Sequence, residues 1–86
     1  MPEISRFYGI VIKLHYNDHA PPHFHAEYGD DNLAVAITQL TPIAGQLPRR
    51  AKDLVLEWAA LHQAELVDAW NRAQAMQPLN KIDPLP

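Results

Sequence analysis

The spacing of apolar residues changes once along this chain, and that change constrains the fold more than any other feature. Before Gly45, apolar and polar side chains alternate, which is the period of half-buried β-strands. After Gly45, apolar residues recur every three or four positions, which is typical of amphipathic helices. The sequence therefore predicts an α+β fold in which a sheet comes first and helices follow.

Three strands and a less regular fourth are predicted in the first half of the chain. The regular strands are expected at residues 10–16 (within an apolar segment that begins at residue 4), 23–28 and 33–38. A fourth, at 40–44, contains Pro42, which has no N–H to donate and so restricts the strand to a sheet edge. Short connections favour antiparallel neighbours. The expected sheet is an antiparallel meander of three to four strands.

The second half predicts two helices and then an extended tail. Pro48 suits the first turn of a helix, where an N–H is not needed. A single helix over residues 48–76 would be ~45 Å long, which is too long for a domain with a radius of gyration of ~12 Å. We therefore expect two helices with a bend near His62. The 86 residues then form a single domain: the meander in 1–45, two helices packed on one face in 48–76, and the tail in 77–86.

Composition excludes several classes of protein. The chain has no cysteine, which excludes disulfides, cysteine zinc sites and thiol catalysis. Its formal charge of −3 argues against a free-standing nucleic-acid binder, although Lys13, Arg49, Arg50 and Lys52 could form a local basic patch. No apolar run approaches the ~20 residues of a membrane span, and no signal peptide is visible. The expected location is the cytoplasm, without membrane contact.

Four of the five histidines lie in one short run, LHYNDHAPPHFHAEYG, at residues 14–29. If the first two strands form a hairpin, their apolar faces must coincide, with Leu14 and Phe24 on the same side. His15, His23, His25 and Glu27 then share the opposite face with Ala34, Ala36 and Thr38 of the third strand. Small residues beside imidazoles would leave a shallow floor, so this face is a candidate site.

Three interpretations of this face remain open from the sequence. His23, His25 and Glu27 are candidate metal ligands, since imidazole and carboxylate suit zinc, iron, nickel or manganese. His15, His23 and His25 are candidate acid–base catalysts, as in RNA cleavage without a metal. Alternatively, the histidines only hydrogen-bond across strands and cap the turn at Asp18. A divalent metal is thus a candidate cofactor but not a requirement, and the sequence does not decide whether the chain is an enzyme.

Other polar residues are candidates for substrate binding. Arg49 and Arg50 fall in the first turn of a predicted helix, where the helix dipole disfavours cations unless an anion such as phosphate lies nearby. With them we group His19 and Tyr28 as candidate substrate-binding residues. Trp58 and Trp70 lie in the apolar stripes and are expected to anchor the core.

Three segments cover nearly the whole chain and carry a family resemblance: PEISRFYGIVIKLHYNDHAPPHFHAEYG, LPRRAKDLVLEWAALHQAEL and DAWNRAQAMQPLNKIDPL. Through them the chain resembles the bacterial domain-of-unknown-function family 4160. The positions that match the family motif residue by residue are His19, Pro21, Pro22, His23, Phe24, His25, Tyr28 and Gly29. Members of this family are small, are often encoded beside a second small protein and have been proposed as halves of toxin–antitoxin pairs. The resemblance implies no mechanism.

The resulting functional expectation is a toxin-type component of a bacterial toxin–antitoxin module. It would act on RNA or a nucleotide through His15, His23 and His25, with Arg49 and Arg50 available for phosphate. Its expected partner is a cognate small protein encoded nearby; RNA and a second copy of the chain are further candidates. The alternative is a non-catalytic interaction module, either an antitoxin-side partner or a regulator, that docks through the histidine face.

Overall fold

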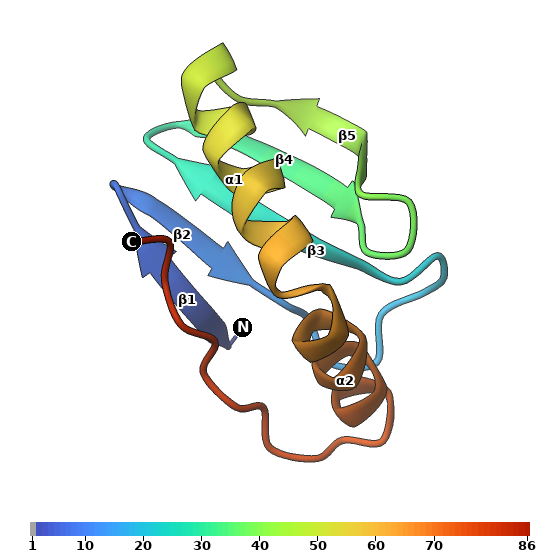
Figure 1. The fold of residues 1–86 in the computed structure, drawn as a ribbon. Coiled ribbons are helices and arrows are strands. Elements are labelled where there is room, and N and C mark those ends of the chain that lie inside the picture. The colour runs from blue at the N-terminus through green and yellow to red at the C-terminus, as the bar shows by residue number, and fades with distance from the viewer. Residues whose placement is uncertain (1) are drawn as a thin grey trace.

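The computed structural model describes residues 2–86, which form an antiparallel sheet of five strands covered by two helices (Figure 1). The strands pair in sequence order: β1 (Glu3–Phe7), β2 (Ile10–Lys13), β3 (His23–Tyr28), β4 (Asp31–Ala36) and β5 (Thr41–Gln46). The helices α1 (Arg49–Leu61) and α2 (Gln63–Gln74) follow. The predicted α+β meander with helices on one face is confirmed, with five strands in place of three to four.

The additional strand arises because segment 4–16 is a hairpin and not a single strand. A two-residue turn at Tyr8 and Gly9, with φ angles of 50° and 79°, connects β1 to β2. Two positive φ angles characterise the turn whose twist matches that of the flanking strands. The sequence did not indicate this turn, because tyrosine rarely adopts a positive φ.

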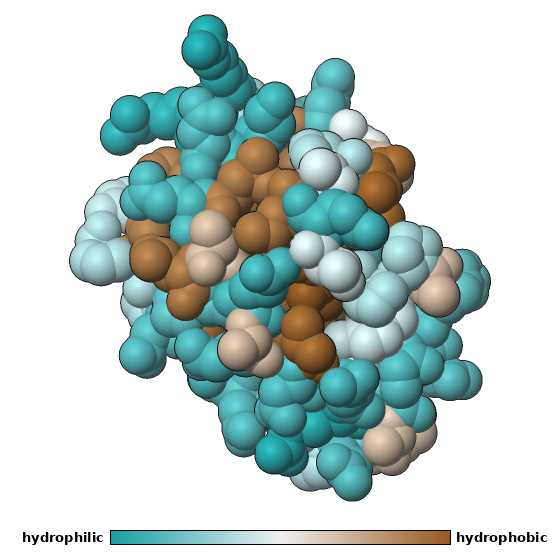
Figure 2. All heavy atoms as spheres, turned by 45° about the vertical axis from the view of Figure 1, so that its right-hand side comes forward, coloured by the Kyte–Doolittle hydropathy of each residue, from teal (hydrophilic) through white to brown (hydrophobic). Residues whose placement is uncertain are grey.

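β5 lies at one edge of the sheet, and Pro42 lies within it, as predicted. Its pairing with β4 is irregular between Ala34 and Val35, opposite the proline. The side chains of β5 are all exposed, Ile43 among them. In Figure 2, apolar side chains reach the surface in patches bordered by hydrophilic ones. Such isolated apolar exposure is ordinary for a folded protein.

The helices meet at His62, whose φ of −123° ends α1 and begins α2, so the predicted bend is confirmed. Trp58 is fully buried and Trp70 nearly so, which confirms both as core residues. The helical spacing of apolar residues also includes Leu61, but this residue is 64% exposed, whereas Trp58 and Ala59 of the same turn are fully buried. Within residues 2–86, neither helix has the length and apolar character that a bilayer crossing requires.

The C-terminal tail returns to β1 and completes the core (Figure 1). The backbone N–H of Ile82 donates to the carbonyl of Ile4 at 2.8 Å, and the Trp58 indole N–H donates to the carbonyl of Asp83 at 2.8 Å. Ile82 and Leu85 are buried, and Leu79 packs against the same cluster. The tail therefore acts as part of the domain.

A substitution at Gly45 can test the register of the edge strand β5. It has a φ of 78°, and a Cβ added there would lie 2.3 Å from the backbone oxygen of Asn32. Gly45→Ala is expected to lower the free energy of unfolding by more than the roughly 1–2 kcal/mol of the left-handed conformation alone. Gly29→Ala is the matched control, because Gly29 has a φ of 59° and nothing within 4 Å of an added Cβ. Equal losses in urea denaturation of the two variants would contradict the predicted clash.

Candidate functional site

The sheet has one face under the helices and one open face. Leu14 and Phe24 are fully buried beneath the helices. His25 pairs with Lys13 on β2 and with Ala34 on β4, and His23 pairs with Ala36. Because side chains alternate along a strand, His23 and His25 point to the open face. The face assignment made from the sequence is confirmed.

The loop between β2 and β3, residues 14–22, carries the remaining members of the site. It is attached to the end of α2 by two hydrogen bonds. The backbone N–H of Asn17 donates to the carbonyl of Ala73 at 3.2 Å, and the Gln74 amide donates to the carbonyl of Asp18 at 2.8 Å. The helical layer thus positions a loop whose side chains reach the opposite face of the sheet.

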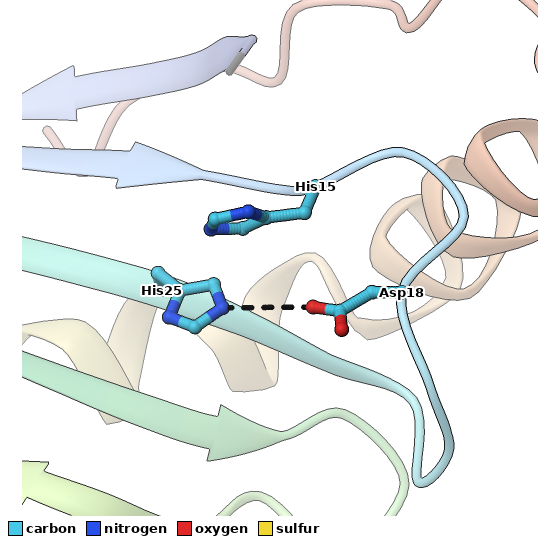
Figure 3. A group of neighbouring side chains, drawn as sticks. All are labelled: His15, Asp18 and His25. Carbon is cyan, nitrogen blue, oxygen red and sulfur yellow. Dashed lines mark ion pairs between the residues drawn. The ribbon is translucent and has the colours of Figure 1, made fainter.

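His15, Asp18, His23 and His25 form what we call the histidine–aspartate cluster. The Asp18 Oδ2 atom lies 3.0 Å from His23 Nε2 and 3.9 Å from His25 Nε2. The ring of His25 has its centroid 4.3 Å from that of His15 and 5.1 Å from that of His23. In Figure 3, His25 comes from β3, whereas His15 and Asp18 both come from the loop that follows β2. Three imidazoles therefore surround one carboxylate.

The environment of Asp18 favours the carboxylate form. Partial burial acts to raise the pKa of this carboxyl. The backbone N–H of His19, which donates to Oδ1 at 2.8 Å, and the imidazoles of His23, His19 and His15 act in the opposite direction and hold the pKa below its ordinary value. Asp18 is therefore negatively charged near neutral pH.

The environment of His25 favours the neutral imidazole. Burial is the main cause that lowers its pKa, and the nearby rings of His15 and His23 lower it further against the opposing charge of Asp18. Its Nε2 atom is buried and has no hydrogen-bond partner among residues 2–86. A buried polar group without a partner costs about 1–3 kcal/mol. The fold therefore maintains an unfavourable arrangement at this nitrogen.

His23 is held from three sides. Its Nδ1 lies 2.7 Å from the carbonyl oxygen of Pro21, and its Nε2 faces Asp18. Its ring lies 5.4 Å from that of Trp70 on α2, and its side chain is only 11% exposed. The carbonyl and the carboxylate both only accept hydrogen bonds, so each of these contacts is a hydrogen bond only with a proton on the ring nitrogen that faces it.

The structure does not bring together the metal ligands expected from the sequence, His23, His25 and Glu27. Glu27 forms an ion pair with Lys13 at 3.1 Å between Oε1 and Nζ. It lies two positions further along β3, which is about 6.6 Å of strand. Instead, one potential ligand atom each from His15, Asp18 and His25 lie within 4.8 Å of one another. The carboxylate comes from the loop, not from the strand.

The expected substrate-binding residues are divided between two places. His19 borders the cluster, with its side chain 96% exposed. Tyr28 and Arg50 line a cavity of about 280 Å³ on the helix side of the sheet, together with Tyr8, Ile10, Pro48, Ala51 and Leu54. Arg49 lies beside Arg50 on the exposed side of α1. Hence both arginines and Tyr28 lie away from the histidines.

Asp18 is the cluster residue that the sequence did not identify as part of the site. It was assigned only to a turn, since Asn-Asp pairs are common there. Its position inside the histidine run, between two strands with histidines on one face, was the available signal. The loop is held by its contacts with α2, and the His19 N–H binds the carboxylate itself; neither contact follows from the strand alternation.

Comparison with known proteins identifies one family. The family model described as "Domain of unknown function (DUF4160)" matches residues 9–71, a range that contains the whole cluster, α1 and most of α2. No curated protein and no solved structure matches the chain.

Proposed function

The chain belongs to the DUF4160 family, and from that premise we propose that it is a toxin-type component of a bacterial toxin–antitoxin module that cleaves RNA. The observation that carries the proposal is the histidine–aspartate cluster itself. Three imidazoles and a carboxylate meet at one end of an otherwise open sheet face. The family description names no activity, so the chemistry is argued from these residues.

The cluster is suited to moving protons. A neutral imidazole accepts a proton, and a protonated one donates it, at neutral pH. None of the four side chains is a hydroxyl or a thiol, and attack by an oxygen of the substrate requires only proton transfer from them. In RNA the 2′-oxygen can attack the adjacent phosphorus while its proton passes to a base. The bond from phosphorus to the 5′-oxygen breaks, and an acid protonates that oxygen. RNA is therefore the substrate class that requires the fewest catalytic groups from this site, because it supplies its own nucleophile.

A cognate small protein, encoded nearby, is the proposed antitoxin. Its proposed binding place is the start of α1, because Arg49 and Arg50 are exposed and the first turn within Arg49–Leu61 contains no acidic residue. An acidic partner would compensate these charges. Such a module would act in the bacterial cytoplasm, and a second copy of the chain is the competing partner.

Expression of the chain alone is expected to arrest bacterial growth, and co-expression of the neighbouring protein is expected to relieve the arrest. The purified chain should cleave single-stranded RNA, seen as new 5′ ends in a primer-extension assay. A variant with alanine at His15, His23 and His25 should do neither. His62→Ala is the control, because His62 pairs with Glu65 at the helix junction, away from the cluster. Growth arrest by the triple variant would favour the non-catalytic interaction module.

A further inference from the structure

We propose that His15, Asp18 and His25 bind a divalent transition-metal ion and that His23 positions the Asp18 carboxylate for it. This metal site would deepen the proposed function. Only the role of the ion in RNA cleavage rests on that function. Binding itself can be tested without RNA. The ligand set differs from the one that the strand sequence suggested, because Glu27 is replaced by a loop residue.

The three ligand atoms are already close to the spacing of a metal site. All lie within 4.8 Å of one another, and the one from His25 lies 3.9 Å from the Asp18 oxygen. Ligands about 2.0–2.2 Å from a tetrahedral zinc ion are roughly 3.4 Å apart. A contraction of about half an ångström would therefore complete the Asp18–His25 side of the site. In Figure 3 the ring nitrogen of His25 and the Asp18 carboxylate face each other.

One nitrogen of the cluster lacks a hydrogen-bond partner within residues 2–86. The buried Nε2 of His25 has no partner among the described residues and points to the carboxylate. An ion between them would satisfy this nitrogen and remove the cost of leaving it unpaired.

The donor set indicates which metals fit. Two imidazoles and one carboxylate favour zinc, iron or nickel over magnesium and calcium, which prefer oxygen ligands. Three protein ligands leave a coordination position for water, as in catalytic and not structural zinc sites. A bound ion would lower the pKa of its water. That water would then attack the phosphorus in place of the 2′-oxygen of RNA, the bond from phosphorus to one ester oxygen would break, and that oxygen would take up the proton that the water gives up.

His23 is a positioning residue in this arrangement. It is anchored to the Pro21 carbonyl and packed near Trp70, so its Nε2 meets Asp18 at a defined place. A carboxylate oxygen has more than one acceptor direction and can contact His23 and a metal together. Partners of this kind orient metal ligands, and their loss lowers metal affinity by roughly 10–100-fold.

The test is a zinc titration of untagged, chelator-treated protein by isothermal calorimetry, with the melting temperature as a second readout. We expect one zinc per chain and a higher melting temperature, by mass action. His25→Ala and Asp18→Asn should abolish both signals. His23→Ala should weaken binding by roughly 10–100-fold, and His23→Gln, which keeps a donor, should recover part of it. Glu27→Gln and His62→Ala should bind zinc like the wild type.

Two results would overturn the inference: no zinc bound by the wild-type chain, or unchanged affinity in His25→Ala and Asp18→Asn. Unchanged affinity in His23→Ala would remove only the positioning role of His23. Weaker binding in Glu27→Gln would instead support the strand ligands. RNA is assayed separately. Zinc binding without RNA cleavage contradicts the proposed function and leaves the metal site intact, whereas cleavage that is insensitive to chelators and blocked by 2′-deoxy substitution contradicts the metal's role.

Discussion

His25→Ala is expected to lower the rate of RNA cleavage by roughly 10²–10⁴-fold, the range that one proton-transferring group contributes. His25 is the central ring of the cluster: its ring lies next to those of His15 and His23, and its Nε2 faces Asp18. The loss is expected whether the ring accepts a proton itself or binds a metal. The fold should be retained, because the side chain lies on the open face and its removal eliminates a buried nitrogen without a partner.

The measurement is a single-turnover cleavage rate at neutral pH, with the melting temperature of the metal-free protein as a check on folding. His62→Ala is the control and should cleave at the wild-type rate. A His25→Ala variant that folds normally and cleaves within twofold of the wild type would place the chemistry elsewhere.

Trp58→Ala is expected to lower the free energy of unfolding by roughly 3–5 kcal/mol, as for other large aromatic residues truncated in a core. Trp58 is fully buried, and its ring centroid lies 5.4 Å from that of Phe7 and 5.8 Å from that of Phe24. Its indole N–H also holds the tail through the Asp83 carbonyl. The substitution therefore creates a cavity and releases the segment that contacts β1. Domains are stable by only ~5–15 kcal/mol, so much of the total could be lost.

Urea denaturation followed by circular dichroism measures this effect. Trp58→Phe keeps one aromatic ring but removes the N–H and part of the ring volume, so we expect an intermediate loss of about 1–3 kcal/mol. Leu61→Ala is the control, because Leu61 is 64% exposed, and should change stability by less than about 0.5 kcal/mol. Comparable losses in Leu61→Ala and Trp58→Ala would contradict the assignment of the core.

Features that depend on periodicity could be predicted from the sequence. Alternation at Leu14 and Phe24 determined which face the helices cover, and the lengths involved required a bend near His62. The β1–β2 hairpin could not be predicted, because its turn depends on a positive φ at Tyr8, a conformation that residue type does not indicate. The same limit applies to Leu61, which continues the apolar spacing of α1 but is 64% exposed.

In the candidate site, too, the residues on strand faces could be predicted from periodicity, whereas the loop residue could not. His15, His23 and His25 were identified from strand alternation and do lie together. Glu27 was grouped with them because it shares their face, but Lys13 pairs with it instead. The role of Asp18 depends on contacts between the loop and α2, which are distant in sequence and follow no period.

The attachment of the loop to α2 also sets the order in which the site can be assembled during synthesis. The hairpin that carries His23 and His25 can form as soon as β2 and β3 have left the ribosome. The carboxylate of Asp18 is placed only when Ala73 and Gln74 are available to bind its loop. A nascent chain that ends before Ala73 would contain all three histidines of the cluster, but the Asp18 carboxylate would not yet be held beside them. Under the proposed function, translation that stops before Ala73 and Gln74 would yield a fragment without the assembled cluster, and the activity would arise only in chains that extend past these residues.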